Sequence, residues 1–467
     1  MTRISPHAAT PPAIGVVQRA TGFDQLRLLV ERGSVTAVLL AVPDMQGRLK
    51  GKRYDARHFL DRVVPGGGAE MCAYVFATDI DMRPVDGYAL TSWDSGYGDV
   101  SLRPAPHTVH LLPWMPRTAL VYADAYSHDG QPVDVSPRQV LRRQLDQLSA
   151  RGITAQVGLE TEFVLYAGSY AHAQKTGYRE IRPTATANLD YALDHPLTMD
   201  AFLRDLQKGL AGAGRPIEAI KTEGAPGQVE VTFPYGDPLS AADTHLLLKH
   251  AARTIGEQAG LAPTFMAAPA TGVGSGCHLH LSLRHGGTPM FAEREGRMPD
   301  AARHVIAGLL DALPHFTPLY APTANSYKRF VPGTFAPANF TWGRDNRTCA
   351  VRVIGRGDAL HLEIRLPGAD ANPYLALAAV LAAAQHGLDH TLGLGPPTIG
   401  NAFQDTLAPP VARTLDEALA DFGITSLAAD LLTPAVAEHY AHAAWQEITA
   451  HRTAVTDLDL HRGFATA

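Results

Sequence analysis

Four short segments of this chain place polar side chains two residues apart within runs of strand-forming residues. The pairs are two acids, an amide with an acid, two imidazoles, and an acid with a guanidinium: Glu160 and Glu162, Gln228 and Glu230, His278 and His280, Glu363 and Arg365. Side chains at positions i and i+2 lie on one face of a strand. If these strands are neighbours, one face of the sheet carries all of these groups while the alternate face stays apolar.

This pattern has two interpretations. Antiparallel sheets often turn one polar face to water. For a single strand of this kind, a solvated sheet face is as good an interpretation as a functional site. The repetition over four strands favours a functional site, because Glu160 and Glu162 have no basic partner close by in the sequence. Glu223 adds a further acid at the edge of a loop. Clustered carboxylates with few imidazoles suit Mg²⁺ or Mn²⁺ rather than zinc.

A second cluster of charged residues in this chain is basic. Arg329, Arg347, Arg352 and Arg365 could hold carboxylate and phosphate groups through paired hydrogen bonds, although scattered surface arginines are the alternative. Metals together with such arginines indicate phosphoryl transfer, which depends on positioning and charge neutralisation. The common nucleotide-binding motifs fail: the segment 47–53 is too short for a P-loop, and 272–277 lacks the last glycine of the dinucleotide motif.

Composition limits the partners and the compartment. The 467 residues carry a formal charge of −6 and no basic tract, which argues against nucleic acid or an anionic membrane as the main partner. Three widely spaced cysteines exclude a disulfide framework and a cysteine-based zinc cluster. With no signal peptide and no apolar run of membrane-spanning length, the sequence predicts a cytoplasmic protein.

The order of patterns along the chain predicts an α+β protein with two parts. Residues 1–22 are expected to form a flexible leader, and residues 23–113 a small domain of one helix and short strands. A Pro-rich join at 104–116 leads into a larger domain, residues 114–467, in which helices alternate with strands. A central antiparallel or mixed sheet with helices outside is the simplest arrangement.

Several of these motifs occur in the order found in one known family. They are GLETEF at 158–163, GQVE at 227–230, GSGCHLHLS at 274–282, NSYKR at 325–329, NRT at 346–348, EIR at 363–365 and ANPY at 371–374. The chain resembles the type I glutamine synthetase superfamily from about residue 23 to 465, and especially its γ-glutamyl-polyamine and γ-glutamyl-ethanolamine synthetase-like branch. The resemblance implies a β-grasp N-terminal domain, a catalytic sheet shaped as a funnel with outer helices, and a dodecamer of two hexameric rings.

The resemblance also implies a role for individual residues. One metal would be held by Glu162, Glu223 and Glu230, and the other by Glu160, His278 and Glu363. Glutamate and phosphate contacts would come from Gly274, Arg329, Arg347 and Arg365. The nucleotide side would include Glu218, His280, Ser282 and Arg352. Asp44, presented by a neighbouring subunit, would help to deprotonate the incoming amine, with Arg347 as the second catalytic residue.

The reaction implied is an ATP-dependent ligation of L-glutamate to an amine through γ-glutamyl phosphate, with two or more Mg²⁺ or Mn²⁺ ions. One departure from the family pattern bears on the amine. Where glutamine synthetases carry a glutamate that binds ammonium, this chain has Phe335. A phenyl ring offers an apolar wall or a cation–π face, which suits an organic amine such as ethanolamine, a polyamine or another monoamine. The alternatives are a true glutamine synthetase that uses ammonium, and a catalytically silent structural or regulatory oligomer.

Overall fold

The computed structural model describes residues 22–331, 334–424 and 427–466. The leader predicted for residues 1–22 therefore lies outside the described residues, except for Gly22.

The N-terminal part of the chain forms a five-stranded sheet with the order β2-β1-β5-β4-β3. β1 and β5 run parallel, and the other neighbours are antiparallel. The strands are β1 Ala37–Pro43, β2 Leu49–Asp55, β3 Ala69–Cys72, β4 Asp99–Leu111 and β5 Thr118–Tyr126. Helix α1 (Phe23–Glu31) buries Leu26 and Val30 in the core of this unit, as the spacing of its apolar residues predicts.

This first sheet extends past the boundary predicted at residue 113. β5 follows the Pro-rich segment and yet lies between β1 and β4. Its buried side chains alternate between two cores: Val121 and Ala123 belong to the N-terminal core, whereas Leu120 and Tyr122 pack with residues of the larger unit. A strand that is covered on both faces reads as a continuous apolar run, so its sequence does not show to which unit it belongs.

The larger unit is built on a ten-stranded sheet, whose main path is β13-β14-β15-β11-β6-β9-β8. β10 and β7 pair with β6, and β12 pairs with β11. Among the described strand pairs of this ten-stranded sheet, only β13–β14 is parallel. The strands are β6 Ile153–Ala167, β7 Arg182–Pro183, β8 Ala219–Thr222, β9 Gln228–Thr232, β10 Leu261–Thr264, β11 Cys277–His285, β12 Thr288–Pro289, β13 Trp342–Arg344, β14 Val351–Ile354 and β15 His361–Ile364.

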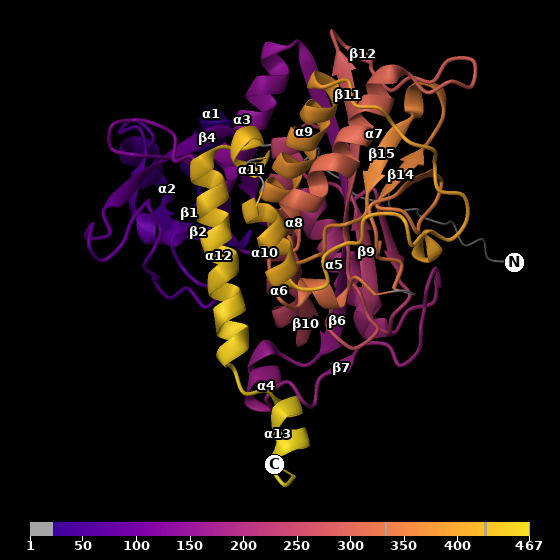
Figure 1. The fold of residues 1–467 in the computed structure, drawn as a ribbon. Coiled ribbons are helices and arrows are strands. Elements are labelled where there is room, and N and C mark those ends of the chain that lie inside the picture. Colours follow the sequence, from indigo (N-terminus) through magenta and orange to yellow (C-terminus); the bar gives the residue numbers. More distant parts are fainter. Residues whose placement is uncertain (1–21, 332–333, 425–426, 467) are drawn as a thin grey trace, which may run out of the picture.

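Helices cover one side of this sheet, as Figure 1 shows for α7, α9, α10 and α12. The α-helices after α1 are α2 Ala56–His58, α3 Pro137–Ala150, α4 Tyr170–Lys175, α5 Leu197–Gly212, α6 Pro238–Gln258, α7 Asp300–Ala312, α8 Thr317–Tyr320, α9 Pro373–Asp389, α10 Leu415–Ile424, α11 Leu427–Leu431, α12 Pro434–Thr453 and α13 Asp457–Gly463. α9 is buried almost throughout and packs against α7 and α3. The alternate residues of the polar strands, among them Leu159, Leu279 and Leu362, point into this core.

A buried polar cluster joins the two units. Arg138 of α3 is 0 % exposed and donates to Asp124 of β5 at 2.9 Å and to Asp243 of α6. Tyr374 of α9 donates to the same Asp243 carboxylate at 2.5 Å, and Tyr122 of β5 donates to the Asp243 carbonyl. Because a buried charge is tolerated only when it is paired, this cluster fixes how β5, α3, α6 and α9 meet.

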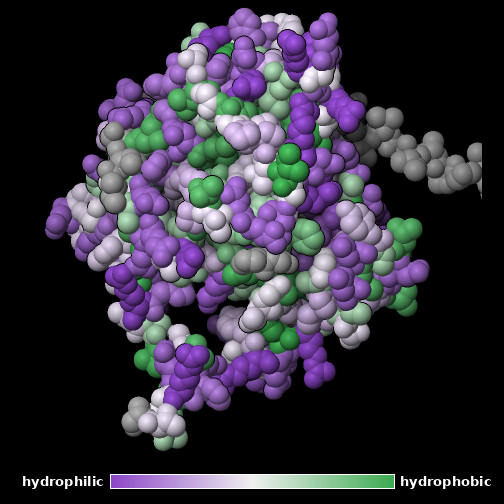
Figure 2. Space-filling model, turned by 45° about the vertical axis from the view of Figure 1, so that its right-hand side comes forward, coloured by the Kyte–Doolittle hydropathy of each residue, from purple (hydrophilic) through white to green (hydrophobic). Residues whose placement is uncertain are grey.

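The C-terminal helix α13 stands away from the rest of the chain (Figure 1). Figure 2 shows this segment as an arm at the lower left, and it shows hydrophobic residues scattered among hydrophilic ones on the same face. None of the helices in the described part of the chain is long and apolar enough to cross a membrane.

Candidate active site

The four polar strands are neighbours, as their sequence pattern predicts. In the register of the sheet, Glu162 of β6 lies opposite Glu230 of β9, and Glu160 of β6 lies opposite His278 of β11. On the far side of β11, His280 lies opposite Glu363 of β15. The polar residues thus share one face across β9, β6, β11 and β15, opposite the helix-covered apolar core.

The first set of predicted metal ligands comes together in the structure. Glu162, Glu223 and Glu230 offer ligand oxygens that lie within 4.8 Å of one another. Glu223 reaches this position from the turn after β8, where its backbone N–H donates to the carbonyl of Gln228 at 3.0 Å. The ammonium of Lys221 contacts Glu223 and lies 3.5 Å from Glu230. The ammonium of Lys221 thus lies among these carboxylates. Their oxygen atoms are the ligands that a hard divalent cation prefers.

The second predicted set is also close together. His278 Nδ1 lies 3.4 Å from Glu160 Oε2 and 3.5 Å from Glu363 Oε1. The structure adds His280, whose Nε2 lies 3.1 Å from Glu160 Oε1 and which forms a compact group with Glu160 and Glu363. The family resemblance predicts a position for His280 on the nucleotide side of the active site. The strand register accounts for its position here, because His280 and Glu363 are direct cross-strand partners.

Burial and charge shift the pKa values of these acids in opposite directions. Burial alone raises the pKa of Glu160, but hydrogen bonds with His278 and His280 outweigh burial and lower it well below its usual range. Burial raises the pKa of Glu230, and the neighbouring charge of Glu160 raises it further. Carboxylates in such close contact repel one another unless a cation lies among them. The arrangement therefore fits binding of a divalent cation.

Gln228 is a residue of this site for which no role was predicted from the sequence. Its side-chain amide donates to Glu162 Oε2 at 3.1 Å and to the Gly274 carbonyl at 2.8 Å. The backbone N–H of Gly276 donates to the same Glu162 oxygen at 2.8 Å. These bonds fix the orientation of the Glu162 carboxylate. The only signal in the sequence was the position of Gln228, two residues before Glu230 on the same strand face.

The predicted arginines lie beside the acids. Arg352 Nη1 donates to Glu363 Oε2 at 3.0 Å, and Arg365 contacts the other oxygen of that carboxylate. Arg329 is buried and donates to the carbonyls of Leu366 and Arg365. Burial lowers its pKa to about 10. These contacts give the face a strong separation of charge, with carboxylates along β6 and β9 and guanidinium groups around β14 and β15.

Close packing around Arg329 explains two glycines of the motif at 274–282. A Cβ on Gly276 would lie 2.7 Å from His278 Nε2 and 2.8 Å from Arg329 Nη2, and a Cβ on Gly274 would lie 3.0 Å from Arg329 Cγ. Only a glycine lets the backbone approach this closely at residue 276.

Four other predicted residues lie at the edges of this face. The side chains of Arg347 and Glu218 are exposed, and Ser282 of β11 is half-buried opposite Gln156. The Arg347 carbonyl accepts a hydrogen bond from Arg365 Nε at 3.1 Å. Phe335 is 64 % exposed at a left-handed backbone position, and its carbonyl accepts from Arg365 Nη2 at 3.2 Å. Arg365 thus connects the loop that carries Phe335 to the Glu363 carboxylate.

Asp44 lies in the turn between β1 and β2. Its side chain is 0 % exposed and accepts from the N–H groups of Gln46 and Arg48 and from Arg48 Nε at 2.8 Å. Asn372 anchors the same turn by donating to the Asp44 carbonyl at 3.1 Å. The role predicted for Asp44, at the site of a neighbouring subunit, stays a prediction. The carboxylate closes the turn between β1 and β2 and does not face solvent.

Comparison with known proteins identifies the family. The model of the glutamine synthetase catalytic domain matches residues 134–462. The chain belongs to the glutamine synthetase family. Gamma-glutamylethanolamide synthetase GlnA4 of Streptomyces coelicolor is 45% identical over 443 residues, which cover 95% of this chain and 96% of that protein. Glutamate–isopropylamine ligase of a Pseudomonas species is 33% identical over 94% of this chain and 97% of its own.

A solved structure supports the same assignment. A complex of GmaS with ADP matches with a TM-score of 0.81 at 26% identity, covering 94% of this chain and 99% of the other. The predicted α+β fold with a glutamine synthetase catalytic unit is therefore confirmed, as is the resemblance to the γ-glutamyl-amine branch. The protein is an ATP-dependent ligase that forms carbon–nitrogen bonds, and its family uses divalent metal ions.

Proposed function

We propose that this enzyme joins L-glutamate to a small organic amine, with ethanolamine or a monoamine of similar size as the acceptor. The γ-carboxylate of glutamate attacks the γ-phosphorus of ATP, which releases ADP. The amine nitrogen then attacks the acyl phosphate and expels inorganic phosphate, which leaves a γ-glutamyl amide. The relatives named for an ethanolamide and for isopropylamine support this acceptor class.

The six ligands predicted from the sequence would hold two divalent cations, Mg²⁺ or Mn²⁺, which neutralise charge on the phosphoryl oxygens. The chain's own residues then have distinct tasks in the proposal. Arg329, which is buried beside Gly274, positions the carboxylate of glutamate, and Arg365 and Arg352 lie ready to neutralise the phosphoryl group. Gln228 holds Glu162 in one orientation, so that the site is preorganised before the substrates enter.

The exposed aromatic ring of Phe335 is the observation that carries the acceptor class. The backbone carbonyl of Phe335 accepts a hydrogen bond from Arg365 at the edge of the charged face, so residue 335 lies next to the predicted glutamate and phosphate contacts, and its side chain is exposed. An ammonium ion needs compact negative or hydrogen-bonding groups around it. A phenyl ring supplies neither of these, whereas it does contact the carbon atoms of an alkylammonium ion or bind its charge by a cation–π interaction.

Release of inorganic phosphate from ATP in the presence of L-glutamate and a panel of amines tests the proposal. Ethanolamine, isopropylamine and short alkylamines should support turnover with a higher kcat/KM than ammonium, with putrescine and spermidine included to probe longer acceptors. Ammonium as the best acceptor would identify a glutamine synthetase. No phosphate release with any amine would favour a catalytically silent member.

Substitution of Phe335 by glutamate tests the role of the ring. We expect Phe335→Glu to raise kcat/KM for ammonium and to lower it for the best organic amine, so that the ratio of the two changes by about tenfold or more. Phe335→Leu is the matched control, because it keeps an apolar wall without a negative charge. An unchanged acceptor profile in Phe335→Glu would show that the ring does not contact the amine.

A further inference from the structure

A large cavity lies apart from the charged sheet face. It has a volume of about 880 Å³ and is enclosed by the β1–β2 turn, the segment 78–83, α6, α12 and the segment 318–325. None of the clustered metal-ligand candidates lines it, and the proposed ligation assigns no task to its side chains. The charged residues of its lining are Arg48, Lys50, Asp79, Asp81, Arg83, Lys249, Arg253, Asp370 and Glu447, together with the histidines His250 and His451.

Three side chains of α6 present hydrogen-bond donors to this cavity. Lys249 and Arg253 are four residues apart, so they are neighbours on one face of the helix, and His250 joins them in the lining. Trp114 Nε1 donates to His250 Nδ1 at 3.0 Å, which leaves the proton of the neutral imidazole on Nε2. Lys249, His250 and Arg253, called the donor wall below, thus offer an ammonium, an imidazole N–H and a guanidinium.

Within the described part of the chain, the donor wall has no acceptor of its own. No hydrogen bond or ion pair reaches the Lys249 ammonium, His250 Nε2 or the Arg253 guanidinium there, and the Lys249 ammonium lies 5.3 Å from the ring centroid of Phe265. Arg253 is exposed, whereas Lys249 and His250 are half-buried. The free nitrogens of Lys249 and His250 are not sealed inside the protein, so a molecule in the cavity can reach them.

The carboxylates nearest to Lys249 are already engaged elsewhere. The charges of Asp370 and Asp44 both act on Lys249, yet neither carboxylate lies within ion-pair distance of it. Asp44 is held by Arg48 at 2.8 Å. Asp370 Oδ2 accepts from Ser326 at 2.6 Å, and its Oδ1 is sealed off from solvent. Neither acid is therefore available to neutralise the donor wall.

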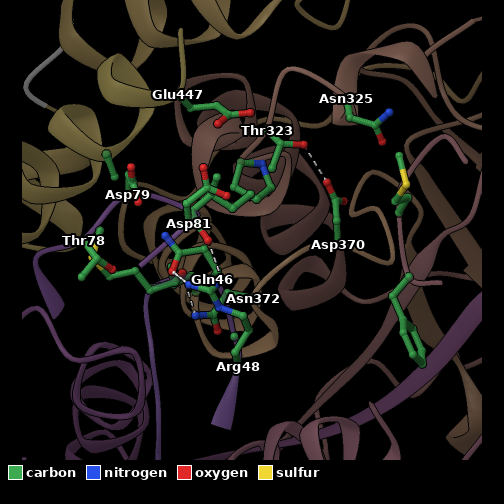
Figure 3. Close-up of a pocket in the computed structure, with 18 of the residues that line it drawn as sticks. Gln46, Arg48, Thr78, Asp79, Asp81, Thr323, Asn325, Asp370, Asn372 and Glu447 are labelled. Carbon is green, nitrogen blue, oxygen red and sulfur yellow. Dashed lines mark hydrogen bonds between the residues drawn. The ribbon is translucent and has the colours of Figure 1, made fainter. Parts of the chain in front are cut away.

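The other acids of the lining belong to elements that α6 does not pack against. α6 packs against α5, α9 and β10, whereas Asp79 and Asp81 lie in the segment 78–83 and Glu447 lies on α12. Figure 3 shows these three acids on one side of the cavity and Asp370 on the other. Glu447 Oε1 also lies 3.3 Å from His451 Nε2. The donor wall is thus a positive part of a cavity whose acids gather elsewhere.

A fourth basic group adds positive charge beside the donor wall. Lys50, near the start of β2, lies 3.9 Å from Asp44 Oδ2. Burial lowers the pKa of Lys50, Lys249 and His250, that of Lys249 to about 8. The charge of Arg253 lowers the pKa of each of them further. Cations that lower one another's pKa repel, so an anion among them would be stabilising.

From these contacts we infer that the donor wall of α6 binds a phosphate group. A phosphate dianion has three terminal oxygens, which can accept from Lys249, His250 Nε2 and Arg253 together. The cavity is larger than one phosphate ion, and apolar lining residues such as Phe265 and Leu375 leave room for the organic part of a phosphate monoester. Inorganic phosphate presents the same oxygens to the same wall. The inference does not depend on which amine the enzyme uses.

Isothermal titration of the full-length protein, at constant ionic strength and without ATP or divalent metal, tests this site. The probes are inorganic phosphate and glycerol 3-phosphate, with glycerol as the uncharged control. We expect a phosphate probe to bind with one equivalent per chain and glycerol not to bind. Tighter binding of glycerol 3-phosphate would identify the ligand as an organic phosphate, and tighter binding of inorganic phosphate as the free ion. Absence of binding by both phosphates would overturn the inference.

Variants locate the binding. Lys249→Met and Arg253→Gln should each weaken the affinity for phosphate by about tenfold or more, because each removes a charged donor. Arg253 is exposed, so Arg253→Gln keeps the test valid should Lys249→Met fail to fold. Arg83→Gln is the matched control, because it makes the same change of charge at an exposed lining position outside α6.

A second control separates this cavity from the active site. Arg352→Gln removes a predicted phosphoryl contact on the charged sheet face and should leave the affinity for phosphate unchanged. Retained affinity in both α6 variants, or loss of affinity in Arg352→Gln, would place the phosphate elsewhere and refute the proposal. An equal loss in Arg83→Gln and Arg253→Gln would show a general effect of charge rather than a site, and would refute it as well.

Discussion

At the scale of single residues, Lys221 has the most unusual surroundings. Its ammonium lies 4.8 Å from the ring centroid of Tyr191 and contacts Glu223, with Glu230 at 3.5 Å. Burial alone lowers the pKa of Lys221, but the hydrogen bond that Lys221 donates to Glu223 and the charge of Glu230 outweigh burial and raise the pKa. Lys221 thus supplies positive charge at the place where the carboxylates are expected to bind a divalent cation.

Replacement of Lys221 by methionine tests whether its ammonium occupies the place of a divalent cation. Without divalent metal we expect Lys221→Met to be less stable by about 1 kcal/mol, or roughly 1 °C in melting temperature for a chain of this length, because two acids lose their counter-charge. Added Mg²⁺ or Mn²⁺ should then raise the melting temperature more in the variant than in the wild type, since the metal no longer competes with an ammonium. Thermal unfolding with and without metal measures both effects.

The control for this experiment is Glu162→Ala, which removes a predicted metal ligand while Lys221 remains. Its melting temperature should respond little to metal, and its turnover should be lost. A metal response in Lys221→Met that is no larger than in the wild type would mean that Lys221 does not compete for the cation.

At the scale of elements, the buried cluster around Arg138 links α3 to β5, α6 and α9. Arg138→Met leaves Asp124 and Asp243 buried without their cation, and we expect a loss of about 3–5 kcal/mol in the free energy of unfolding. Arg143→Met on the same helix is the matched control. Its partner Asp134 is exposed, so the expected loss is below about 1 kcal/mol. Urea unfolding followed by circular dichroism compares the two, and equal losses would contradict the assigned role.

Helix α12 carries a histidine that makes stability depend on pH. Burial lowers the pKa of His439, which packs 4.6 Å from the ring of Tyr88, to about 3, against about 6.5 in an unfolded chain. Between these pH values the unfolded chain binds a proton that the folded chain does not, so stability falls as the pH falls, by up to about 1.4 kcal/mol per unit.

Unfolding midpoints between pH 7 and pH 5 measure this dependence. His439→Gln should lose less stability over the interval than the wild type, whereas His451→Gln, at an exposed position of the same helix, should follow the wild type. Equal acid sensitivity in all three proteins would assign the effect to other groups.

The sequence was sufficient to predict which residues form the charged sheet face, but it was not sufficient to predict the contacts around that face. Alternation within β6, β9, β11 and β15 predicts which side chains share a face, because the strand period is two. It does not reveal the order of strands, and so the contact between His280 and Glu363 was missed. The membership of β5 in the first sheet was hidden because this strand is apolar on both faces. The hydrogen bond from Asn372 to the Asp44 carbonyl was hidden because the two residues lie more than three hundred positions apart.

At the scale of the whole molecule, the C-terminal arm bears on the predicted assembly. Val455, Leu458 and Phe464 are exposed on or next to α13, which stands clear of the chain's own core (Figure 1). Apolar side chains on a projecting segment are usually buried by another chain, and a second copy is the simplest partner. We propose that the arm connects subunits within the dodecamer that the family resemblance implies.

Native mass spectrometry tests this assembly. Twelve copies of the 50.0 kDa chain give a particle of about 600 kDa. Removal of residues 455–467, or joint replacement of Val455, Leu458 and Phe464 by serine, should shift the population to a smaller particle, because the interface then loses its apolar contacts. Arg452→Gln, which removes an exposed ion pair with Asp416 just before the arm, is the control and should keep the full assembly. A wild-type protein that stays monomeric would contradict the dodecamer, and an intact dodecamer after truncation would show that other surfaces hold the subunits together.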